Sequence, residues 1–420
     1  MSRSACGYTR SINFFGRLSP RDLLRVYGSP LYVYNEKILR ERCRDLKKLS
    51  ANPAFEVNYS VKANSNPALL RVVKEEGLRV DAMSLGELAM DRLAGFDPKN
   101  VLFISNNNTR EELCQAVAAG CLVSVDSLSQ LASLGEIAPG AKTMCRINPG
   151  IGAGHSAKVI TGGANTKFGI DADRMGEIIE LARRYDLRLA GLNQHIGSLF
   201  MSPEKYLAAS SFLLEYARAL PPDRFEQLEI LDFGGGFGIP YHKYDGEKRL
   251  DLGALAEGLN ALMSDFQAKT SYRGKFLIEP GRYVMAECGT LLGQIVAIKD
   301  NGDARYVGTD IGFNVLQRPV MYDAWHDIEV YAPDDRDLLC QTVVGNICES
   351  GDILAKNRPL PEMREGDVIG LLDAGAYGFS MASNYNDRFL PAEVLITEDG
   401  CCNLIRRRQR AEDLAACLLP

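Results

Sequence analysis

Residues 175–198 read MGEIIELARRYDLRLAGLNQHIGS, which is a helical pattern followed by a short apolar run and a polar end. Apolar residues recur at helical spacing over Met175–Tyr185, and Leu189–Gln194 has the length and composition of a buried strand. The run leads into His195-Ile-Gly-Ser198. A strand that follows a helix and ends in polar residues predicts one unit of an α/β fold, with chemistry placed where the strand ends.

The same alternation runs from about residue 55 to 285. Eight apolar runs have the length of strands: Phe55–Val61, Leu78–Ala82, Val101–Ile104, Leu122–Val125, Thr143–Ile147, Leu189–Gln194, Leu228–Leu231 and Phe276–Ile278. Helical patterns lie between them, at Pro67–Glu76, Leu85–Ala94, Thr109–Ala119, Met175–Tyr185, Lys205–Leu220 and Leu252–Gln267. Eight strand–helix units over this length predict a TIM-like (β/α)8 barrel. A doubly wound open sheet remains an alternative, because the number of strands does not establish closure.

After about residue 286 the pattern changes to short strands separated by turn residues. The strand patterns are Leu291–Ile298, Ile328–Tyr331, Gln341–Val344, Val368–Leu372 and Glu393–Ile396. Helical periodicity is scarce there, so this part predicts an antiparallel β domain, which an early run at Pro30–Tyr34 could join. We therefore expect a barrel over residues 36–285 and a β domain formed by residues 1–35 and 286–420.

The composition excludes several classes of protein. The chain has 420 residues, 46% of them hydrophobic and 24% charged, which is ordinary for a globular protein and excludes wholesale disorder. A formal net charge of −6 without basic blocks argues against nucleic acid as a partner. No apolar run reaches the roughly 18 residues of a membrane span. We expect a cytoplasmic location, because the N-terminus lacks the apolar segment of a secretory signal.

The cysteines and histidines do not form a recognisable site. Eleven cysteines are scattered along the chain without a CxxC pair, and there are four histidines. The sequence therefore predicts neither a disulfide framework nor a metal site. Most of the cysteines are expected to be small buried residues.

Polar residues follow five of the predicted barrel strands. Lys62 follows the first strand, Asp81 ends the second, His195 follows the sixth, a glycine run Gly234–Gly238 follows the seventh, and Glu279 follows the eighth. Taken singly, the lysine could be a surface residue, the histidine a core residue and the glycine run a tight turn. Barrel enzymes place their chemistry at the carboxyl ends of the strands, so these residues are expected to converge on one rim.

The glycine run and the lysine together suggest a phosphate-bearing cofactor. Glycines let backbone N–H groups approach an anion, and barrel phosphate sites commonly follow strands seven and eight. No Gly-Lys-Ser/Thr follows the run, so it is not a P-loop. A lysine opposite a phosphate site suggests pyridoxal phosphate, whose aldehyde forms a Schiff base with an amine. Glu279 could then pair with the pyridine nitrogen, and His195 could stack on the ring.

Seven motifs extend this interpretation to a resemblance. They are YSVKAN (Tyr59–Asn64), HIGS (His195–Ser198), GGGFGIPY (Gly234–Tyr241), EPGR (Glu279–Arg282), Arg318-Pro319 with Tyr322, CESGD (Cys348–Asp352) and GAYGFSMASNY (Gly375–Tyr385). The chain resembles the fold-type III pyridoxal-phosphate decarboxylases. The CESGD form is similar to the members that act on diaminopimelate, whereas ornithine decarboxylases typically carry Cys-Asp-Gly there.

The resemblance implies roles for individual residues. Lys62 would hold the cofactor covalently, and Lys62 and Cys348 would be catalytic. The other cofactor-binding residues would be Asp81, His195, Ser198, Gly235, Gly236, Glu279, Gly281, Arg282 and Tyr377. The substrate-binding residues would be Arg282, Arg318, Tyr322, Glu349 and Tyr377. The family also implies a homodimer with shared active sites, in which the β domain carries Cys348 and Glu349 across the interface.

The implied reaction is decarboxylation of meso-diaminopimelate to L-lysine and CO2, the last step of lysine biosynthesis. Diaminopimelate carries a second carboxylate at its distal end, and arginines such as Arg282 and Arg318 bind carboxylates bidentately. The sequence departs from the usual family pattern at Val315 and Gln317 and after Tyr385. A decarboxylase of D-lysine, D-ornithine or another diamino acid therefore remains an alternative. A silent regulatory homologue is a more remote one, because Lys62, Glu279 and Cys348 are all present.

Overall fold

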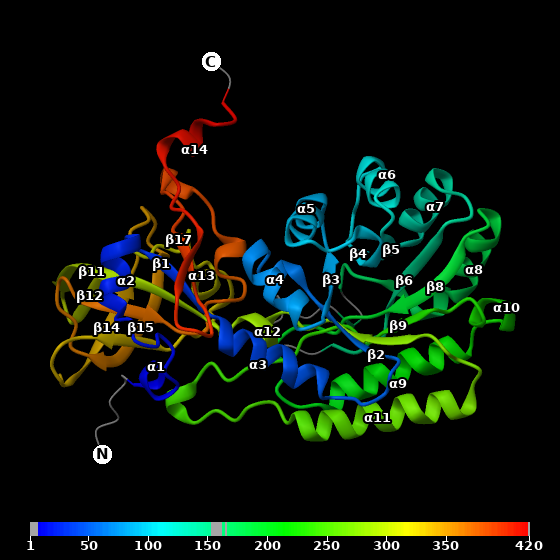
Figure 1. Ribbon diagram of the computed structural model, residues 1–420, viewed down its shortest axis with the longest axis horizontal. Coiled ribbons are helices and arrows are strands. Elements are labelled where there is room, and N and C mark those ends of the chain that lie inside the picture. The colour runs from blue at the N-terminus through cyan, green and yellow to red at the C-terminus, as the bar shows by residue number, and fades with distance from the viewer. Residues whose placement is uncertain (1–6, 153–161, 164–165, 419–420) are drawn as a thin grey trace. The chain divides into compact units, whose positions relative to one another are not determined.

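The computed structural model describes residues 7–152, 162–163 and 166–418, and these fall into two compact units. The barrel unit comprises Arg40–Ile239 and Arg249–Val284. The β unit comprises Met1–Leu39, Pro240–Lys248 and Met285–Pro420. Each unit combines segments that are far apart in the sequence, and each is described by itself below (Figure 1).

Eight parallel strands of the described residues close into the barrel. Their order is β5-β4-β3-β2-β10-β9-β8-β6, and β6 pairs with β5 to complete the ring. The strands are β2 (Phe55–Tyr59), β3 (Arg79–Ala82), β4 (Leu102–Ile104), β5 (Leu122–Val125), β6 (Lys142–Asn148), β8 (Arg188–Asn193), β9 (Ile230–Asp232) and β10 (Lys275–Ile278). A short strand, β7 (Ile170–Asp171), pairs with the carboxyl end of β6. The predicted barrel is confirmed, and the open sheet is excluded because the ring closes.

Helices alternate with these strands (Figure 1). Between residues 36 and 285 they are α3 (Glu36–Lys47), α4 (Pro67–Glu75), α5 (Leu85–Ala94), α6 (Arg110–Ala118), α7 (Leu128–Ile137), α8 (Met175–Arg184), α9 (Glu204–Arg218), α10 (Pro222–Phe225), α11 (Leu252–Lys269) and α12 (Arg282–Met285). Side-chain caps such as Ser84 and Thr109 start several of them by accepting a backbone N–H of the first turn. We did not predict α7, whose Gly135 packs closely against the ring of Tyr185.

The β unit is built on a mixed sheet in which the N-terminal strand is central. Strand β1 pairs antiparallel with β11 and parallel with β17, so the predicted membership of the N-terminal strand is confirmed. The strands are β1 (Leu31–Asn35), β11 (Gly289–Asn301), β12 (Ala304–Thr309), β13 (Ile328–Tyr331), β14 (Leu338–Val344), β15 (Ile353–Pro361), β16 (Val368–Leu371), β17 (Ala392–Ile396) and β18 (Cys402–Arg406). Its helices are α1 (Tyr8–Ser11), α2 (Pro20–Tyr27), α13 (Arg318–Tyr322) and α14 (Ala411–Ala415). Most pairings are antiparallel, and β12 with β14 is a second parallel pair.

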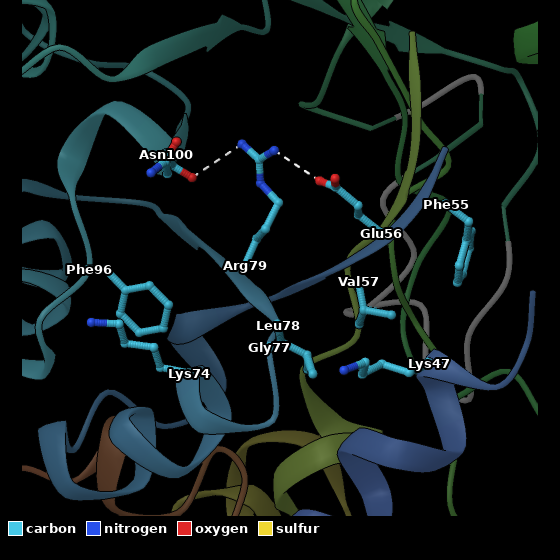
Figure 2. Close-up of a pocket in the computed structure, with 10 residues that line it drawn as sticks. All are labelled: Lys47, Phe55, Glu56, Val57, Lys74, Gly77, Leu78, Arg79, Phe96 and Asn100. Atoms are coloured by element: carbon cyan, nitrogen blue, oxygen red, sulfur yellow. Dashed lines mark hydrogen bonds and ion pairs between the residues drawn. The ribbon is translucent and has the colours of Figure 1, made fainter. Parts of the chain in front are cut away.

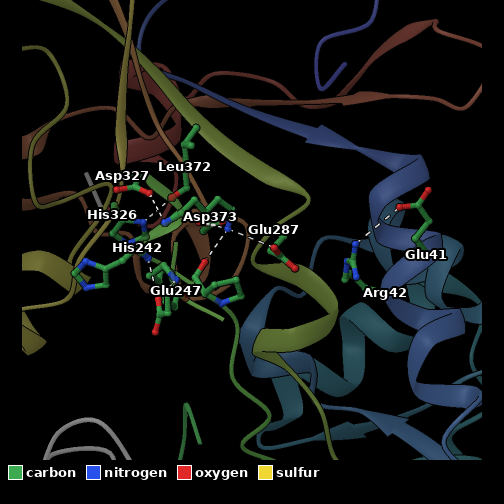
Figure 3. Close-up of polar contacts among 12 residues, drawn as sticks. Glu41, Arg42, His242, Glu247, Glu287, His326, Asp327, Leu372 and Asp373 are labelled. Atoms are coloured by element: carbon green, nitrogen blue, oxygen red, sulfur yellow. Dashed lines mark hydrogen bonds and ion pairs between the residues drawn. The ribbon is translucent and has the colours of Figure 1, made fainter. Parts of the chain in front are cut away.

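Residues 240–248 lie within the range predicted for the barrel but pack with the β unit. The ammonium of Lys243 lies 2.8 Å from Asp373 and 3.3 Å from Glu287, and its backbone N–H donates to Asp327 over 2.8 Å. Figure 3 shows these three carboxylates gathered around the segment. A buried ammonium needs such partners, and it draws the segment that follows the glycine run into the β unit.

A pocket of about 480 Å³ opens beside the first strands of the barrel (Figure 2). Its lining includes Phe55 and Glu56 at the start of β2 and Arg79 at the start of β3. It therefore lies at the amino ends of the strands, away from the rim where barrel enzymes place their chemistry. Among the described residues, no helix is long and apolar enough to span a bilayer.

Candidate active site

The ends of β2 and β3 bring Lys62 and Asp81 together. Lys62 lies in a 3₁₀ turn, Val61–Ala63, directly after β2, and its side chain is exposed. The backbone N–H of Val61 donates to Oδ1 of Asp81 over 2.9 Å. Burial and the nearby Glu279 charge raise the pKa of Asp81 well above its usual value, while the Lys62 ammonium opposes that shift. The buried carboxyl thus fixes the turn that presents the lysine.

The glycine run after β9 lies directly on the backbone that carries Glu279. Gly234 and Gly236 have φ of 75° and 107°, in the left-handed region that favours glycine. A Cβ at Gly235 would collide with the carbonyl oxygen of Glu279, and the N–H of Glu279 donates to Gly234 over 2.9 Å. Side chains are therefore excluded from this loop, which leaves backbone groups at the rim.

His195 is held by the same loop. Its Nδ1 accepts a hydrogen bond from the N–H of Gly235 over 3.1 Å. Burial, followed by the nearby charges of Lys62 and Arg146, holds the pKa of His195 well below its usual value. The imidazole is therefore neutral, and its ring proton is on Nε2. Binding of a phosphate by the N–H of Gly235 remains a prediction, because in this structure that donor is engaged by the imidazole.

Glu279 and Asp232 form a buried pair of carboxyl groups. Burial, with the neighbouring Asp232 charge, raises the pKa of Glu279 well above its usual value. Burial also raises the pKa of Asp232 to about 7, although its Oδ1 accepts the N–H of Gly234 over 2.8 Å. Among the described residues, Oε1 of Glu279 is buried without a hydrogen-bond partner. A donor brought by a ligand would satisfy that oxygen.

Two further predicted residues meet beside the glycine run. The guanidinium of Arg282 donates to the hydroxyl of Ser198, at 2.9 Å from Nη2 and 3.3 Å from Nε. Arg282 is the first residue of α12, and Gly281, directly before it, is buried. The predicted residues of the barrel unit thus lie at or after the carboxyl ends of β2, β3, β8, β9 and β10.

The β unit holds the other predicted residues on three segments. Arg318 begins α13, where it is buried beside His326, and Tyr322 ends the same helix. Tyr377 lies after β16 with a φ of 56°. Cys348 and Glu349 are exposed in the loop between β14 and β15. In that loop the N–H of Cys348 donates to Asn386 over 2.8 Å, and Glu349 accepts the hydroxyl of Tyr385.

We did not predict two charged groups in the barrel interior. Arg146 lies in β6 with its guanidinium carbon 4.6 Å from the centre of the Phe168 ring, and burial lowers its pKa. The charges of Glu279, Asp126 and Asp232 oppose that lowering. The sequence feature that could have predicted this charged group is a lone arginine within an otherwise apolar strand. Asp232, the last residue of β9, is the second group.

A comparison with known protein families identifies the family to which this chain belongs. The family described as pyridoxal-dependent decarboxylase, pyridoxal binding domain, matches residues 36–286, more than half of the chain. This chain belongs to the pyridoxal-dependent decarboxylases. Pyridoxal phosphate is the cofactor of this decarboxylase, and the family and cofactor predicted from the sequence are confirmed.

Similar proteins cover almost the whole decarboxylase chain. A diaminopimelate decarboxylase of Methanothermobacter thermautotrophicus is 40% identical over 94% of this chain and 92% of its own. That of Escherichia coli is 35% identical over 95% of this chain and 96% of its own. The crystal structure of diaminopimelate decarboxylase from Helicobacter pylori complexed with L-lysine has a TM-score of 0.86 at 30% identity, covering 95% of this chain and 98% of that chain.

The rim residues of this decarboxylase fit pyridoxal phosphate. The exposed amine of Lys62 can bond to an aldehyde. The buried Oε1 of Glu279 lacks a donor among the described residues, and a protonated pyridine nitrogen is such a donor. The loop around Gly235 excludes side chains and offers backbone groups to a phosphate.

Proposed function

We propose that this decarboxylase converts meso-diaminopimelate to L-lysine and CO2. The observation that supports this choice of substrate is the burial of Arg318, which is 2% exposed. A buried cation favours a substrate that brings a second carboxylate, and an arginine can bind that carboxylate bidentately. The similarity to diaminopimelate decarboxylases over more than nine-tenths of the chain supports the same substrate.

We assign the cofactor contacts as follows. Lys62 would bond to the cofactor aldehyde, Glu279 would accept from the pyridine nitrogen, and the neutral ring of His195 would lie against the cofactor. The backbone at Gly235, Gly236, Gly281 and Arg282 would bind the phosphate. Asp81, Ser198 and Tyr377 would be further cofactor contacts. When bound, pyridoxal phosphate supplies the electron sink for the electron pair left by the departing carboxylate.

The substrate contacts in this proposal come from Arg282, Arg318, Tyr322, Glu349 and Tyr377. Cys348 of the partner subunit delivers a proton to the carbon that has lost CO2. Its exposure in the described chain, on a loop held by Asn386, leaves the thiol accessible to a second subunit. The proposal therefore includes a homodimer with shared active sites. Its cofactor domain spans residues 36–285, of which residues 240–248 pack with the β domain formed by residues 1–35 and 286–420.

A product assay across diamino acids tests the substrate. The purified enzyme with pyridoxal phosphate is offered meso-diaminopimelate, D-lysine, D-ornithine, L-lysine and L-ornithine, and CO2 and amine products are measured. We expect meso-diaminopimelate to have the highest kcat/KM and to yield L-lysine. A higher kcat/KM for D-lysine or D-ornithine would replace this proposal by the alternative substrate class.

A further inference from the structure

A buried hydrogen-bonded chain in the β unit connects Arg318 to the segment after β16. Nη1 of Arg318 lies 2.7 Å from Nε2 of His326, and Nδ1 of His326 lies 2.7 Å from the carbonyl oxygen of Leu372. Figure 3 shows His326 beside Leu372. His326 is 1% exposed, so water does not compete for these bonds.

The two partners decide which ring nitrogen carries the proton. The carbonyl oxygen of Leu372 only accepts, so Nδ1–H of His326 donates to it. The guanidinium of Arg318 only donates, so Nε2 accepts from it. His326 is therefore a neutral imidazole with its proton on Nδ1. A neutral acceptor orients a guanidinium without cancelling the positive charge that attracts a carboxylate.

Ring contacts restrict both members of this pair. The guanidinium carbon of Arg318 lies 4.6 Å from the centre of the Tyr241 ring. The same tyrosine meets the imidazole of His326 edge to face, with ring centres 5.5 Å apart. These contacts hold the guanidinium and the imidazole against one aromatic ring.

The backbone around His326 is held as well. Its carbonyl oxygen accepts a hydrogen bond from Arg358, whose guanidinium carbon lies 3.3 Å from the centre of the Trp325 ring. The indole N–H of Trp325 donates to Asp327 over 2.8 Å. The imidazole therefore stands on a backbone that is fixed on both sides.

We propose that His326 is a positioning residue that sets the direction of the Arg318 guanidinium toward the distal carboxylate of the substrate. This inference rests on the proposed function, in which Arg318 receives that carboxylate. A guanidinium carries its N–H donors in a rigid fork, so holding one nitrogen sets the direction of the others. His326 thus contributes to the choice of a dicarboxylate substrate through Arg318.

Replacement of His326 tests this role in the holoenzyme. His326→Phe keeps an aromatic ring but removes both hydrogen bonds, and we expect KM for meso-diaminopimelate to rise about tenfold to a hundredfold. We expect kcat to stay within about twofold. The competitive inhibition constant of cadaverine (1,5-diaminopentane), which has the same two amines but no carboxylate, should stay within the same range. His326→Gln can still reach Arg318 with an amide oxygen, so part of the loss should be recovered.

A matched control is His242→Gln. His242 stacks on Trp325 with ring centres 4.3 Å apart, and its side chain is 41% exposed. We expect both KM and the inhibition constant to be unchanged in this variant. Far-UV circular dichroism reports whether each variant keeps its fold.

Nitrogen-15 NMR of histidine-labelled wild-type holoenzyme gives a readout that does not need a variant to fold. With four histidines in the sequence, we expect one to show a protonated Nδ1 and an unprotonated Nε2. Saturating meso-diaminopimelate should shift that Nε2 signal, and cadaverine, which has no carboxylate, should not. A protonated Nε2 on His326, or an equal shift with both ligands, would overturn the inference.

Arg318→Met separates this inference from the proposed function. If Arg318→Met raises KM for meso-diaminopimelate but His326→Phe and His326→Gln do not, positioning by His326 is wrong and the proposed function stands. If Arg318→Met has no effect on KM, the substrate role of Arg318 fails, and the inference fails with it. Equal losses for meso-diaminopimelate and cadaverine in His326→Phe would show a structural role instead.

Discussion

The backbone N–H of Gly235 donates to Nδ1 of His195, which joins the loop after β9 to the segment after β8. The bond requires a lone pair on Nδ1, so the ring proton is on Nε2. The lowered pKa of His195, caused first by burial and then by the charges of Lys62 and Arg146, keeps the ring neutral around pH 7. A neutral imidazole suits contact with an aromatic cofactor more than proton delivery.

A methyl group at Gly235 should weaken cofactor binding. In Gly235→Ala the new Cβ meets the carbonyl oxygen of Glu279, so the loop must move away from that backbone. We expect the dissociation constant for pyridoxal phosphate to rise at least about tenfold, since a 1 Å displacement of a binding group has effects of this size. This dissociation constant is measured from the absorbance of the protein-bound cofactor after dialysis against a series of cofactor concentrations. Gly176→Ala, in α8 with open space around its Cβ, is the control and should bind normally.

Removal of the Lys62 amine should abolish turnover. In Lys62→Ala the group that bonds to the cofactor aldehyde is gone, so the absorbance of the covalently held cofactor should disappear. The matched control is Lys47→Ala, because Lys47 lines the pocket at the opposite end of the strands. Activity of Lys62→Ala close to wild type would show that another amine holds the cofactor.

Two inactive chains should restore activity when mixed. If each site combines Lys62 of one subunit with Cys348 of the other, a dimer of Lys62→Ala with Cys348→Ala has one complete site. Random exchange should then recover about a quarter of the wild-type sites, since half of the dimers are mixed and each has one intact site of two. Mixing Lys62→Ala with the double variant Lys62→Ala, Cys348→Ala is the control and should stay inactive. Proven exchange without recovered activity would rule out shared sites.

Loss of the Arg318 charge should change specificity. Arg318→Met removes a charge-assisted bond to the distal carboxylate, which is worth about 1.5–3 kcal/mol, or roughly ten- to a hundredfold in kcat/KM for meso-diaminopimelate. Inhibition by cadaverine (1,5-diaminopentane) should change little, because cadaverine has no carboxylate. Measuring kcat/KM for meso-diaminopimelate and the inhibition constant of cadaverine tests this prediction. If both weaken equally, Arg318 supports the fold or the cofactor site instead.

Neutralising Asp91 should stabilise the protein in a pH-dependent way. Asp91 lies in α5 with 0% exposure, and among the described residues neither of its carboxyl oxygens has a hydrogen-bond partner. Burial, followed by the charges of Asp81 and Glu87, raises its pKa to about 8. An unfolded aspartate ionises near pH 4, so between about pH 4 and pH 8 ionisation favours the unfolded chain increasingly.

Asp91→Asn removes the loss of stability that ionisation of Asp91 causes as the pH rises. The free energy of unfolding of the variant should exceed that of the wild type by little near pH 4 and by a few kcal/mol at about pH 8, above which the difference should level off. Chemical denaturation at pH 5, 6.5 and 8 measures it. Asp265→Asn, on the exposed side of α11, is the control and should show no comparable growth. A constant or falling difference across this range would mean that Asp91 is ionised in the folded state.

Much of the barrel could be predicted because its signals are local. The bounds predicted for the strand Leu122–Val125 and for the helix Leu85–Ala94 agree with those of β5 and α5. Strand β15 was missed because exposed polar residues and two prolines, Pro359 and Pro361, hide its pattern. Its hydrogen bonds come from pairing with β14, which the segment alone does not reveal.

By itself the sequence determined the order of the barrel strands and helices and the polar residues at their ends, because periodicity and turn chemistry act within short segments. Only the tertiary structure decided that residues 240–248 pack with the β unit, that Asp91 is buried and that His326 orients Arg318. The physical reason is that burial and hydrogen-bond partners depend on several segments meeting in space. Lys243 and Asp373 are 130 residues apart, and neither segment alone predicts that their side chains pair.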